Sequence, residues 1–243
     1  MPVAGVVGHT RVRKLPSLSA FFPCRNEANH VQTMAQRTLA VLPHVAERYE
    51  LIIVDDGSTD GTEKIADQIA ASDAYVRVVH NRPNRGYGGA LKAGFRAARH
   101  EYVFFTDGDS QFDPGELPKL VERVDEADMV VGYRIKRADP LHRLVFGRCW
   151  GLLVRALFGL KIRDLNCAFK LMPRSVIESV EIESNRGFMV AEMMCKLARR
   201  GYSFVEVGVG HYPQDKGVGG SPGFILGAFV DLFRLLWKVR RYR

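Results

Sequence analysis

The stretch YVFFTDGDSQ, residues 102–111, places an uncharged segment directly before two aspartates and a glutamine. Tyr102 to Thr106 has the length and apolar character of a buried strand. The sequence from Pro114 onward is typical of a helix, and proline suits the first turn because its missing N–H costs little there. The stretch therefore predicts a strand and then a helix, with Asp107, Asp109 and Gln111 at the carboxyl end of the strand.

The same alternation of strand and helix runs through the first half of the chain. We expect strands at Leu18–Pro23, Leu51–Val54, Val76–His80, Tyr102–Thr106 and Met129–Tyr133. We expect helices between them at Glu27–Glu47, Gly61–Ser72, Gly86–His100 and Pro114–Glu126. Strict alternation predicts an α/β, Rossmann-like domain over 17–134, with a parallel sheet and helices on both faces.

The second half of the chain is less regular. Strand-like pieces at Cys167–Met172 and Phe204–Tyr212 lie between two strongly apolar helices, His142–Leu160 and Phe224–Val239. No apolar run reaches the roughly 18–20 residues that a membrane span requires. The first residues carry positive charge after a short apolar run, the reverse of a signal peptide, so we expect a basic flexible arm over 1–16.

The C-terminal helix, within 223–243, has the profile of an amphipathic helix that lies in a membrane surface. Its cations Arg234, Lys238 and Arg241 recur at helical spacing and form one polar stripe. Apolar side chains fill much of the remaining surface: Phe229, Leu232, Phe233, Leu236 and Trp237. Such a helix places cations among lipid headgroups. The helix at 142–160 is similar, and the alternative for both is packing on the sheet or on a partner subunit.

Composition limits the class of protein without deciding it. A chain of 243 residues can form one sizeable domain, and its net charge of +8 attracts nucleic acid, anionic membranes or phosphorylated small molecules. The basic residues gather in the second half beside apolar helices and do not alternate with aromatics, so we expect no nucleic-acid partner. The four scattered cysteines predict neither a disulfide framework nor a zinc cluster and are typical of a reducing compartment.

Three polar clusters follow predicted strands: PCRNE at 23–27, DDGS at 55–58 and DGDSQ at 107–111. Ligands of open parallel sheets bind beyond the carboxyl ends of the strands, so we expect all three clusters at one rim. The last cluster can direct several oxygens at one hard cation, Mg²⁺ or Mn²⁺, which would neutralise a diphosphate leaving group. The alternative is an acidic turn whose aspartates cap the next helix.

The stretch NRGYGG at 84–89 is a weaker signal. Its glycines could hold a phosphate group at the start of a helix, or they could simply form a tight turn. It matches neither the P-loop nor the dinucleotide-binding fingerprint.

The motifs PCRNE, IVDDGSTDGT, NRGYGGAL and DGDSQ, in this order and spacing, resemble the GT-A glycosyltransferases of family 2. The likeness covers residues 17–240. The D-x-D-x-Q form is similar to the branch of dolichol-phosphate mannose synthases and bacterial polyprenyl-phosphate glycosyltransferases. The resemblance implies a catalytic domain over 17–222. It also implies inverting transfer of a hexose from GDP-mannose or a UDP-hexose to a polyprenyl or dolichyl phosphate.

The resemblance also implies roles for individual residues. The donor would be bound by Pro23, Arg25, Glu27, Val54, Asp56, Asp107, Gly108, Asp109 and Arg134. The metal, Mg²⁺ or Mn²⁺, would be held by Asp109 and Gln111, and these two residues and Arg143 would be catalytic. Asp164, the CAFK segment at 167–170 and Glu192 continue the family pattern.

The acceptor side departs from the family pattern at one loop. Relatives carry an arginine before a G-x-S motif, whereas Gln214 falls at this position here and Lys216 is the nearest cation. We therefore expect Arg143, Lys216 and Gln214 around the acceptor phosphate. A lipid acceptor implies a peripheral protein on the cytoplasmic side of an anionic membrane surface, with an integral-membrane partner or a second copy as further candidates.

Two other functions stay open at this point. A family 2 enzyme could act on a soluble or saccharide hydroxyl, which needs a carboxylate base, whereas a phosphate acceptor is already ionised. A non-catalytic subunit of a membrane complex is the more remote alternative, because the acidic rim is intact.

Overall fold

The computed structural model describes residues 14–135, 141–213 and 231–232. Within the helix that begins at Leu141, side chains are described for Arg148 and from Gly151 onward. The predictions for residues 1–13, for Gln214 and Lys216, and for most of the C-terminal helix lie outside the described residues.

The described part of the chain contains a seven-stranded sheet with the order β3-β2-β1-β4-β6-β5-β7. The strands are β1 (Leu15–Cys24), β2 (Ala46–Asp55), β3 (Val76–His80), β4 (Tyr102–Thr106), β5 (Met129–Arg134), β6 (Phe169–Pro173) and β7 (Phe204–Val209). β1 pairs in parallel with β2 and β4, β2 with β3, and β5 with β7. β6 alone runs antiparallel to its neighbours β4 and β5.

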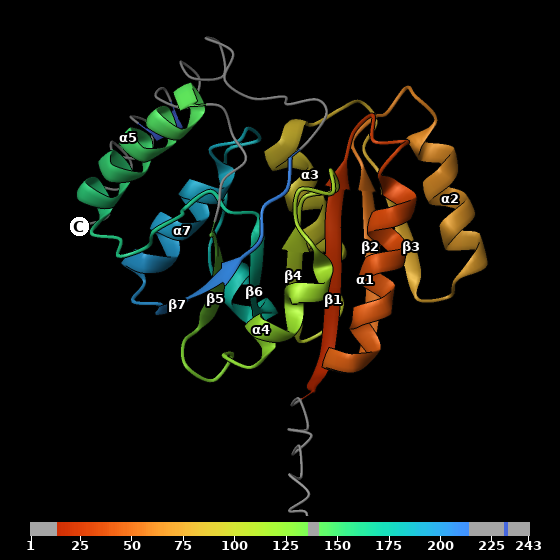
Figure 1. Cartoon of the computed structure of the whole chain (residues 1–243), viewed down its shortest axis with the longest axis horizontal. Coiled ribbons are helices and arrows are strands. Elements are labelled where there is room, and N and C mark those ends of the chain that lie inside the picture. The colour runs from red at the N-terminus through yellow and green to blue at the C-terminus, as the bar shows by residue number, and fades with distance from the viewer. Residues whose placement is uncertain (1–13, 136–140, 214–230, 233–243) are drawn as a thin grey trace, which may run out of the picture.

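Helices cover both faces of this sheet (Figure 1). They are α1 (Val31–Val45), α2 (Thr62–Ser72), α3 (Gly86–Ala97), the 3₁₀ turn η1 (Pro114–Glu116), α4 (Leu117–Val121), α5 (Leu141–Phe158), α6 (Arg174–Glu178) and α7 (Met189–Arg199). α1 contacts β1, β2, α2 and α4 in front of the sheet, while α3 packs behind β1 and β2. α5 packs on α7, at the outer edge of the molecule.

The α/β class and the parallel arrangement of the first four strands are confirmed, but the neighbour of β4 was not foreseen. β6 comes from the second half of the chain and lies between β4 and β5, so the sheet is mixed. β5 still runs parallel to β4, because two successive antiparallel pairings restore the direction. Strand order in space does not follow strand order in sequence, and an alternating pattern alone does not reveal an inserted strand.

Two predicted helices are longer than the observed ones. The helix expected over Glu27–Glu47 spans only Val31–Val45, and residues from Ala46 extend β2, where Ala46 pairs with Leu15. The helix expected over Pro114–Glu126 is a 3₁₀ turn followed by one short helix that ends at Val121. β1 begins at Leu15, so the last two residues of the expected arm belong to the sheet.

The core forms on both sides of β1, where Phe21 and Phe22 are fully buried on opposite faces. The Phe21 ring stacks on Phe105 at 5.7 Å between centroids and meets Phe95 edge-on at 5.0 Å. Gly94 brings α3 against this ring, since a Cβ there would lie 2.3 Å from Phe21. The glycine therefore sets the distance between α3 and the sheet.

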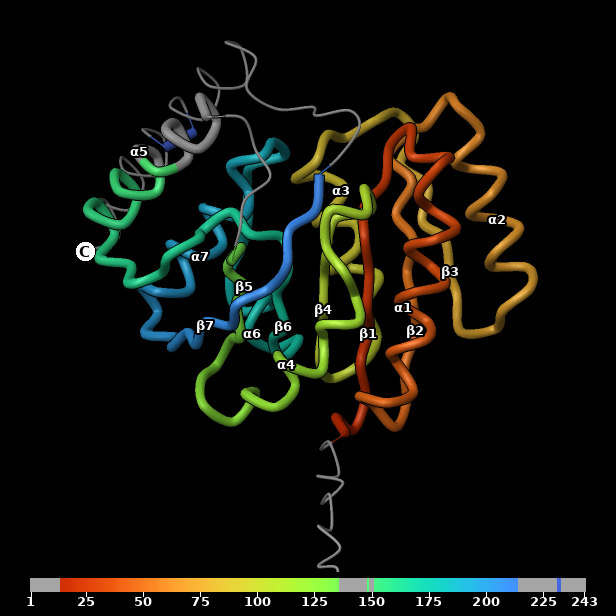
Figure 2. Tube along the Cα trace, in the orientation of Figure 1, coloured from red at the N-terminus to blue at the C-terminus, as the bar shows by residue number. Residues whose placement is uncertain are grey.

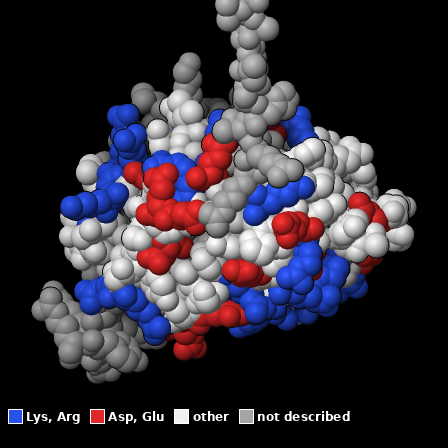
Figure 3. Space-filling view, turned by 90° about the horizontal axis from the view of Figure 1, so that it is seen from below, with Lys and Arg blue, Asp and Glu red and all other residues white. Residues whose placement is uncertain are grey.

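The described residues also define helix length, the state of three cysteines and the distribution of charge on one face. None of the helices in the described ranges is long and apolar enough to cross a membrane. Cys24, Cys167 and Cys195 are buried and free. The face at the amino ends of the parallel strands carries groups of both signs of charge, without one continuous basic surface (Figure 3).

We predict that Gly94→Ala destabilises the protein. Alanine exceeds glycine in helix propensity by about 1 kcal/mol, so propensity alone predicts a gain in stability. The contact with Phe21 predicts the opposite sign, a net loss of about 1–3 kcal/mol from overpacking, measured by urea denaturation. Gly151→Ala in α5 is the matched control, because its Cβ would meet nothing closer than 3.9 Å. A more stable Gly94→Ala protein would contradict the packing described for α3.

Candidate functional site

The three polar clusters meet at the carboxyl ends of β1, β2 and β4, as the sequence predicts. Pro23 pairs with Val54 across β1 and β2, and the backbone N–H of Asp56 donates to the carbonyl of Cys24 at 3.0 Å. The turn after β4 abuts them, since a Cβ at Gly108 would lie 2.6 Å from the carbonyl oxygen of Pro23. A side chain at position 108 would separate this turn from β1.

Asp56 is buried and its carboxylate is held on one side only. Its Oδ1 accepts hydrogen bonds from the Asn81 side chain and from the backbone N–H of Arg85, both at 2.9 Å. The Asn84 side chain donates to the Asp56 carbonyl at 3.0 Å. Among the described residues nothing donates to Oδ2. Asp56 is therefore fixed in orientation and retains one acceptor oxygen for a ligand.

Asp55, next to Asp56, belongs to a separate cluster with His80 and Asp67. Its Oδ1 accepts the N–H of Ser58 at 3.1 Å, and its Oδ2 lies 3.2 Å from Nδ1 of His80, whose Nε2 lies 3.0 Å from Asp67. Burial lowers the pKa of His80, but the hydrogen bonds to both carboxylates outweigh this and raise it. Possible ligand atoms of Asp55, Glu63 and His80 lie within 4.8 Å of one another, so this group could also hold a metal.

Asp107 and Asp109 lie close together after β4. The hydroxyl of Tyr87 donates to Oδ1 of Asp107 at 2.7 Å, and Oδ1 of Asp109 accepts the N–H of Gln111 at 3.0 Å. Burial and the charge of Asp109 raise the pKa of Asp107 to about 7. Burial also raises the pKa of Asp109, with a further contribution from Glu27. Two crowded carboxylates of this kind favour a bound cation, because a cation stabilises their ionised form.

Gln111 is anchored to the segment that follows β7. Its amide nitrogen donates to the carbonyl of Tyr212 at 3.3 Å, and the N–H of Tyr212 donates back to the carbonyl of Gln111 at 2.9 Å. Figure 2 follows this segment from β7 up to the loop after β4. The amide nitrogen is thus engaged with protein, which leaves the amide oxygen as the group that could bind a cation.

Arg134, at the end of β5, forms a two-pronged ion pair with Asp164. Nε donates to Oδ2 at 2.6 Å and Nη2 to Oδ1 at 2.8 Å, with only 12% and 14% of the two side chains exposed. Lys170 is fully buried on β6 and donates to the carbonyl of Cys167. The charges of Arg134 and Lys170 both lower the pKa of Asp107, so two nearby cations stabilise that carboxylate in its ionised form.

The structure therefore brings most of the predicted residues to one rim: Pro23, Glu27, Val54, Asp56, Asp107, Gly108, Asp109, Gln111 and Arg134. Arg25 lies in the loop after β1 with an exposed side chain. The side chain of Arg143, on α5, and the residues Gln214 and Lys216 lie outside the described part. Sequence reasoning gave no role to Tyr87 or Asn81. The only signal for Tyr87 was a tyrosine inside a glycine-rich stretch.

The structure favours the tight-turn alternative for the start of α3, because the N–H groups of its three glycines already bind protein. The N–H groups of Gly88 and Gly89 donate to the carbonyl of Asn185, at 3.0 and 3.3 Å, and that of Gly86 donates to the Asn84 side chain. Donors that already bind protein are not available to a phosphate. Glu192, which continues the family pattern in the sequence, also binds backbone. Its carboxylate accepts the N–H groups at 183 and 184, both at 2.9 Å.

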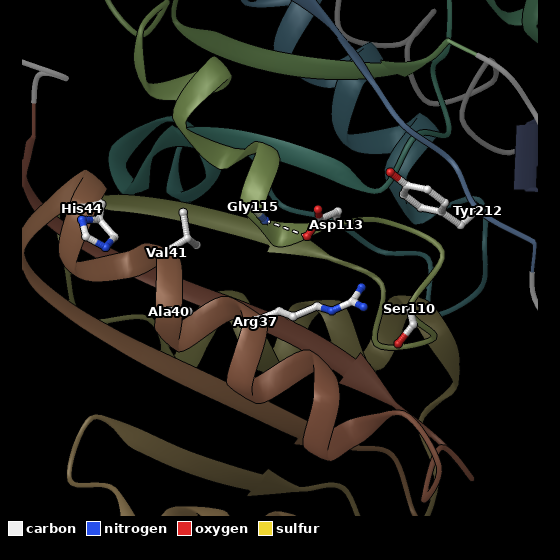
Figure 4. A pocket seen from close by; sticks show the side chains of 8 residues that line it. All are labelled: Arg37, Ala40, Val41, His44, Ser110, Asp113, Gly115 and Tyr212. Carbon is white, nitrogen blue, oxygen red and sulfur yellow. Dashed lines mark hydrogen bonds between the residues drawn. The ribbon is translucent and has the colours of Figure 1, made fainter. Parts of the chain in front are cut away.

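A groove of about 810 Å³ lies beside this rim, between α1 and the loop after β4 (Figure 4). Its lining residues are Arg37, Ala40, Val41, His44, Ser110, Asp113, Gly115 and Tyr212. None of the predicted donor or metal residues lines it. Ser110 and Tyr212 bring one end of the groove next to Gln111.

Comparison with known proteins identifies relatives of this chain. The sequence model described as Glycosyl transferase family 2 matches residues 19–180. The chain is 32% identical to glycosyltransferase AglD of Haloferax volcanii over 232 residues, which cover 91% of this chain and 37% of AglD. It is 34% identical to the dodecaprenyl-phosphate galacturonate synthase of Rhizobium johnstonii over 169 residues, 68% of this chain and 50% of that enzyme. The chain thus spans half or less of these two relatives.

A solved structure with the same fold is glucosyl-3-phosphoglycerate synthase from Mycobacterium tuberculosis, in complex with Mn²⁺, UDP and glucosyl-3-phosphoglycerate. The TM-score is 0.70 with 20% sequence identity, over 91% of this chain and 80% of the synthase. At this identity the likeness establishes the GT-A fold.

The ion pair at the rim predicts a large coupling between Arg134 and Asp164. Asp164→Ala should cost about 3–5 kcal/mol of stability, because it leaves a buried guanidinium without its carboxylate. Adding Arg134→Met should recover part of this loss, so the two changes should not be additive in urea denaturation. The exposed pair Arg123–Glu126 is the control, and changes at these two positions should be close to additive. Additive losses at 134 and 164 would contradict the buried pair.

Proposed function

The chain belongs to glycosyltransferase family 2, and we propose that it transfers a hexose from a nucleotide sugar to a polyprenyl phosphate at a membrane surface. The single observation that carries this proposal is the crowding of Asp107 and Asp109 at the rim, with Asp56 on one side and Arg134 on the other. The name of the Rhizobium johnstonii relative supports the class of acceptor.

The nucleoside binds between the loops after β1 and β2. Pro23, Arg25 and Glu27 line one side and Val54 and Asp56 the other. The open Oδ2 of Asp56 suits the ring N–H of a base, and guanine and uracil both carry such a donor. This contact does not distinguish GDP-mannose from a UDP-hexose.

Mg²⁺ or Mn²⁺ belongs at Asp109 and Gln111. The donors available there are a carboxylate and an amide oxygen, the oxygen ligands that these hard cations prefer. When bound, the ion would act as a Lewis acid toward the diphosphate of the donor. The Mn²⁺ and UDP in the synthase of the same fold support this assignment. The group of Asp55, Glu63 and His80 is the competing location.

The chain's own side chains account for the rest of the transfer. Asp164 holds the Arg134 guanidinium in one plane, so its charge is already oriented when the nucleotide diphosphate departs. Arg143, Lys216 and Gln214 bind the acceptor phosphate and align it for in-line attack on the anomeric carbon, with inversion. The acceptor phosphate is ionised and needs no base.

An exposed apolar surface on α5 supports contact with a membrane. Leu152 is 60% exposed, Leu153 38% and Leu157 40%, whereas Val154 between them is buried. The expected C-terminal membrane helix has less support at its described residues, because Leu232 is buried and Asp231 accepts a hydrogen bond from Ser184 at 3.1 Å. The proposal therefore places α5 on an anionic membrane surface, on the cytoplasmic side. An integral-membrane partner or a second copy would be an additional contact.

A second candidate function has one observation in its favour. Transfer to a soluble or saccharide hydroxyl needs an ionised carboxylate as general base, and such a base works best when its pKa lies near the operating pH. Asp107, with its pKa raised to about 7, has that property.

The metal assignment predicts that Asp109→Ala and Gln111→Ala each lower turnover by about a hundredfold or more, because each removes a metal ligand and neither removes core. Chelation should abolish activity, and Mn²⁺ or Mg²⁺ should restore it. His80→Gln should leave the Mn²⁺ dependence unchanged, and this variant is the control for the competing location. Full activity in excess chelator would refute the metal assignment, and loss of Mn²⁺ dependence in His80→Gln alone would move the ion to Asp55.

The acceptor class predicts a product of defined chemistry. Incubation with a panel of sugar nucleotides and a short polyprenyl phosphate should yield an acid-labile product that partitions into organic solvent and is identified by mass. The matching polyprenyl alcohol should not react, because it lacks an ionised nucleophile. Comparable transfer to the alcohol or to a soluble sugar would favour the second candidate.

A further inference from the structure

The start of α3 is held in place by the loop before α7, around residues 183–186, which is distant in sequence. The carbonyl of Asn185 accepts the N–H groups of Gly88 and Gly89. This approach requires glycine, because a Cβ at Gly88 would lie 2.7 Å from both the carbonyl carbon of Asn185 and the carbonyl oxygen of Arg186. Gly86 has φ of +75°, and a Cβ there would lie 2.8 Å from the Asn185 oxygen. The first turn of α3 thus has one possible position against this loop.

This loop is itself held by hydrogen bonds to side chains of α7 and α3. Glu192 on α7 is buried and accepts two backbone N–H groups of the loop, and it pairs with Lys196 at 2.7 Å. Lys92 on α3 donates to the carbonyl of Glu183 at 3.1 Å. α3, the loop and α7 therefore form one hydrogen-bonded unit.

Tyr87 is the side chain that this unit directs at the rim. It belongs to the first turn of α3, its ring packs against the core, and its hydroxyl donates to Oδ1 of Asp107 at 2.7 Å. No other described residue donates to the Asp107 carboxylate. This one hydrogen bond therefore determines which carboxylate oxygen faces the protein and which faces the space beyond the strand.

We infer that Tyr87 is a positioning residue that acts through Asp107: its hydroxyl occupies Oδ1 and presents Oδ2 to the nucleotide diphosphate and its metal. The inference rests on the proposed function. The like charge of Asp109 repels the Asp107 carboxylate, and the charges of Arg134 and Lys170 attract it. The hydroxyl of Tyr87 adds a hydrogen bond of fixed direction at Oδ1, and it comes from a helix that is itself held in place.

The test compares Tyr87→Phe with Tyr102→Phe. Both changes remove one hydroxyl and keep the ring, and Tyr102 lies at the opposite end of β4 from Asp107. Binding of UDP and of GDP is titrated calorimetrically in the presence of Mn²⁺, and kcat and KM are measured for donor and acceptor. Tyr87→Phe should weaken nucleotide binding or raise donor KM by about 10–100-fold, the effect of losing a hydrogen bond to a charged group. Acceptor KM and the midpoint of thermal unfolding should stay near wild type, and Tyr102→Phe should match wild type throughout.

A double-mutant cycle with Asp107→Asn separates positioning from a general structural role. If Tyr87 acts through Asp107, Tyr87→Phe should have no further effect on nucleotide affinity in the Asp107→Asn background. An equal loss in both backgrounds, or wild-type affinity in Tyr87→Phe, would overturn the inference. Failure of the wild-type protein to bind either nucleotide with Mn²⁺ would instead count against the proposed function, so the two failures are distinguishable.

Discussion

The crowding of the partly buried Asp107 and Asp109 is the constraint on which the rest of the site depends. Ionised carboxylates are costly to bury close together, and the pKa of both groups is raised as a result. Two features of the fold offset part of this cost. The Tyr87 hydroxyl donates a hydrogen bond to one oxygen of Asp107, and the charges of Arg134 and Lys170 lie nearby. These neighbours moderate the repulsion without removing it, and the cation that we propose at this rim would stabilise both carboxylates in their ionised form.

The inserted strand β6 explains why Lys170 and Arg134 lie near Asp107. Lys170 pairs with Phe105 on β4 and with Val131 on β5, which places it between the strand that carries Asp107 and the strand that carries Arg134. Burial lowers the pKa of this lysine, and its ammonium group donates a hydrogen bond to the backbone carbonyl of Cys167. Asp164, just before β6, then holds Arg134. The antiparallel strand thus brings the second half of the chain into a site that the first half begins.

The back of the sheet and the outer edge of the molecule differ in their packing around this site. Behind it, glycines let α3 approach both Phe21 and the loop before α7, so the helix that carries Tyr87 has little freedom to move. At the outer edge, α5 packs on α7 and leaves leucines exposed. A rigid donor side and an apolar outer surface are what an enzyme needs if it binds a soluble nucleotide sugar and meets its acceptor in a lipid layer.

The sequence by itself determined the α/β class, the approximate strands and the meeting of three polar clusters at one rim, because the carboxyl ends of parallel strands share an edge of the sheet. It also determined the family, through motifs that each lie within a few neighbouring residues. Only the tertiary structure decided the insertion of β6, the pairing of Arg134 with Asp164 and the hydrogen bond from Tyr87 to Asp107. The carbonyl that anchors α3 belongs to Asn185, about a hundred residues away, and a backbone carbonyl is present at every position, so no residue type marks it. Contacts of that kind follow from how the elements pack, and a pattern confined to one segment of the chain does not contain them.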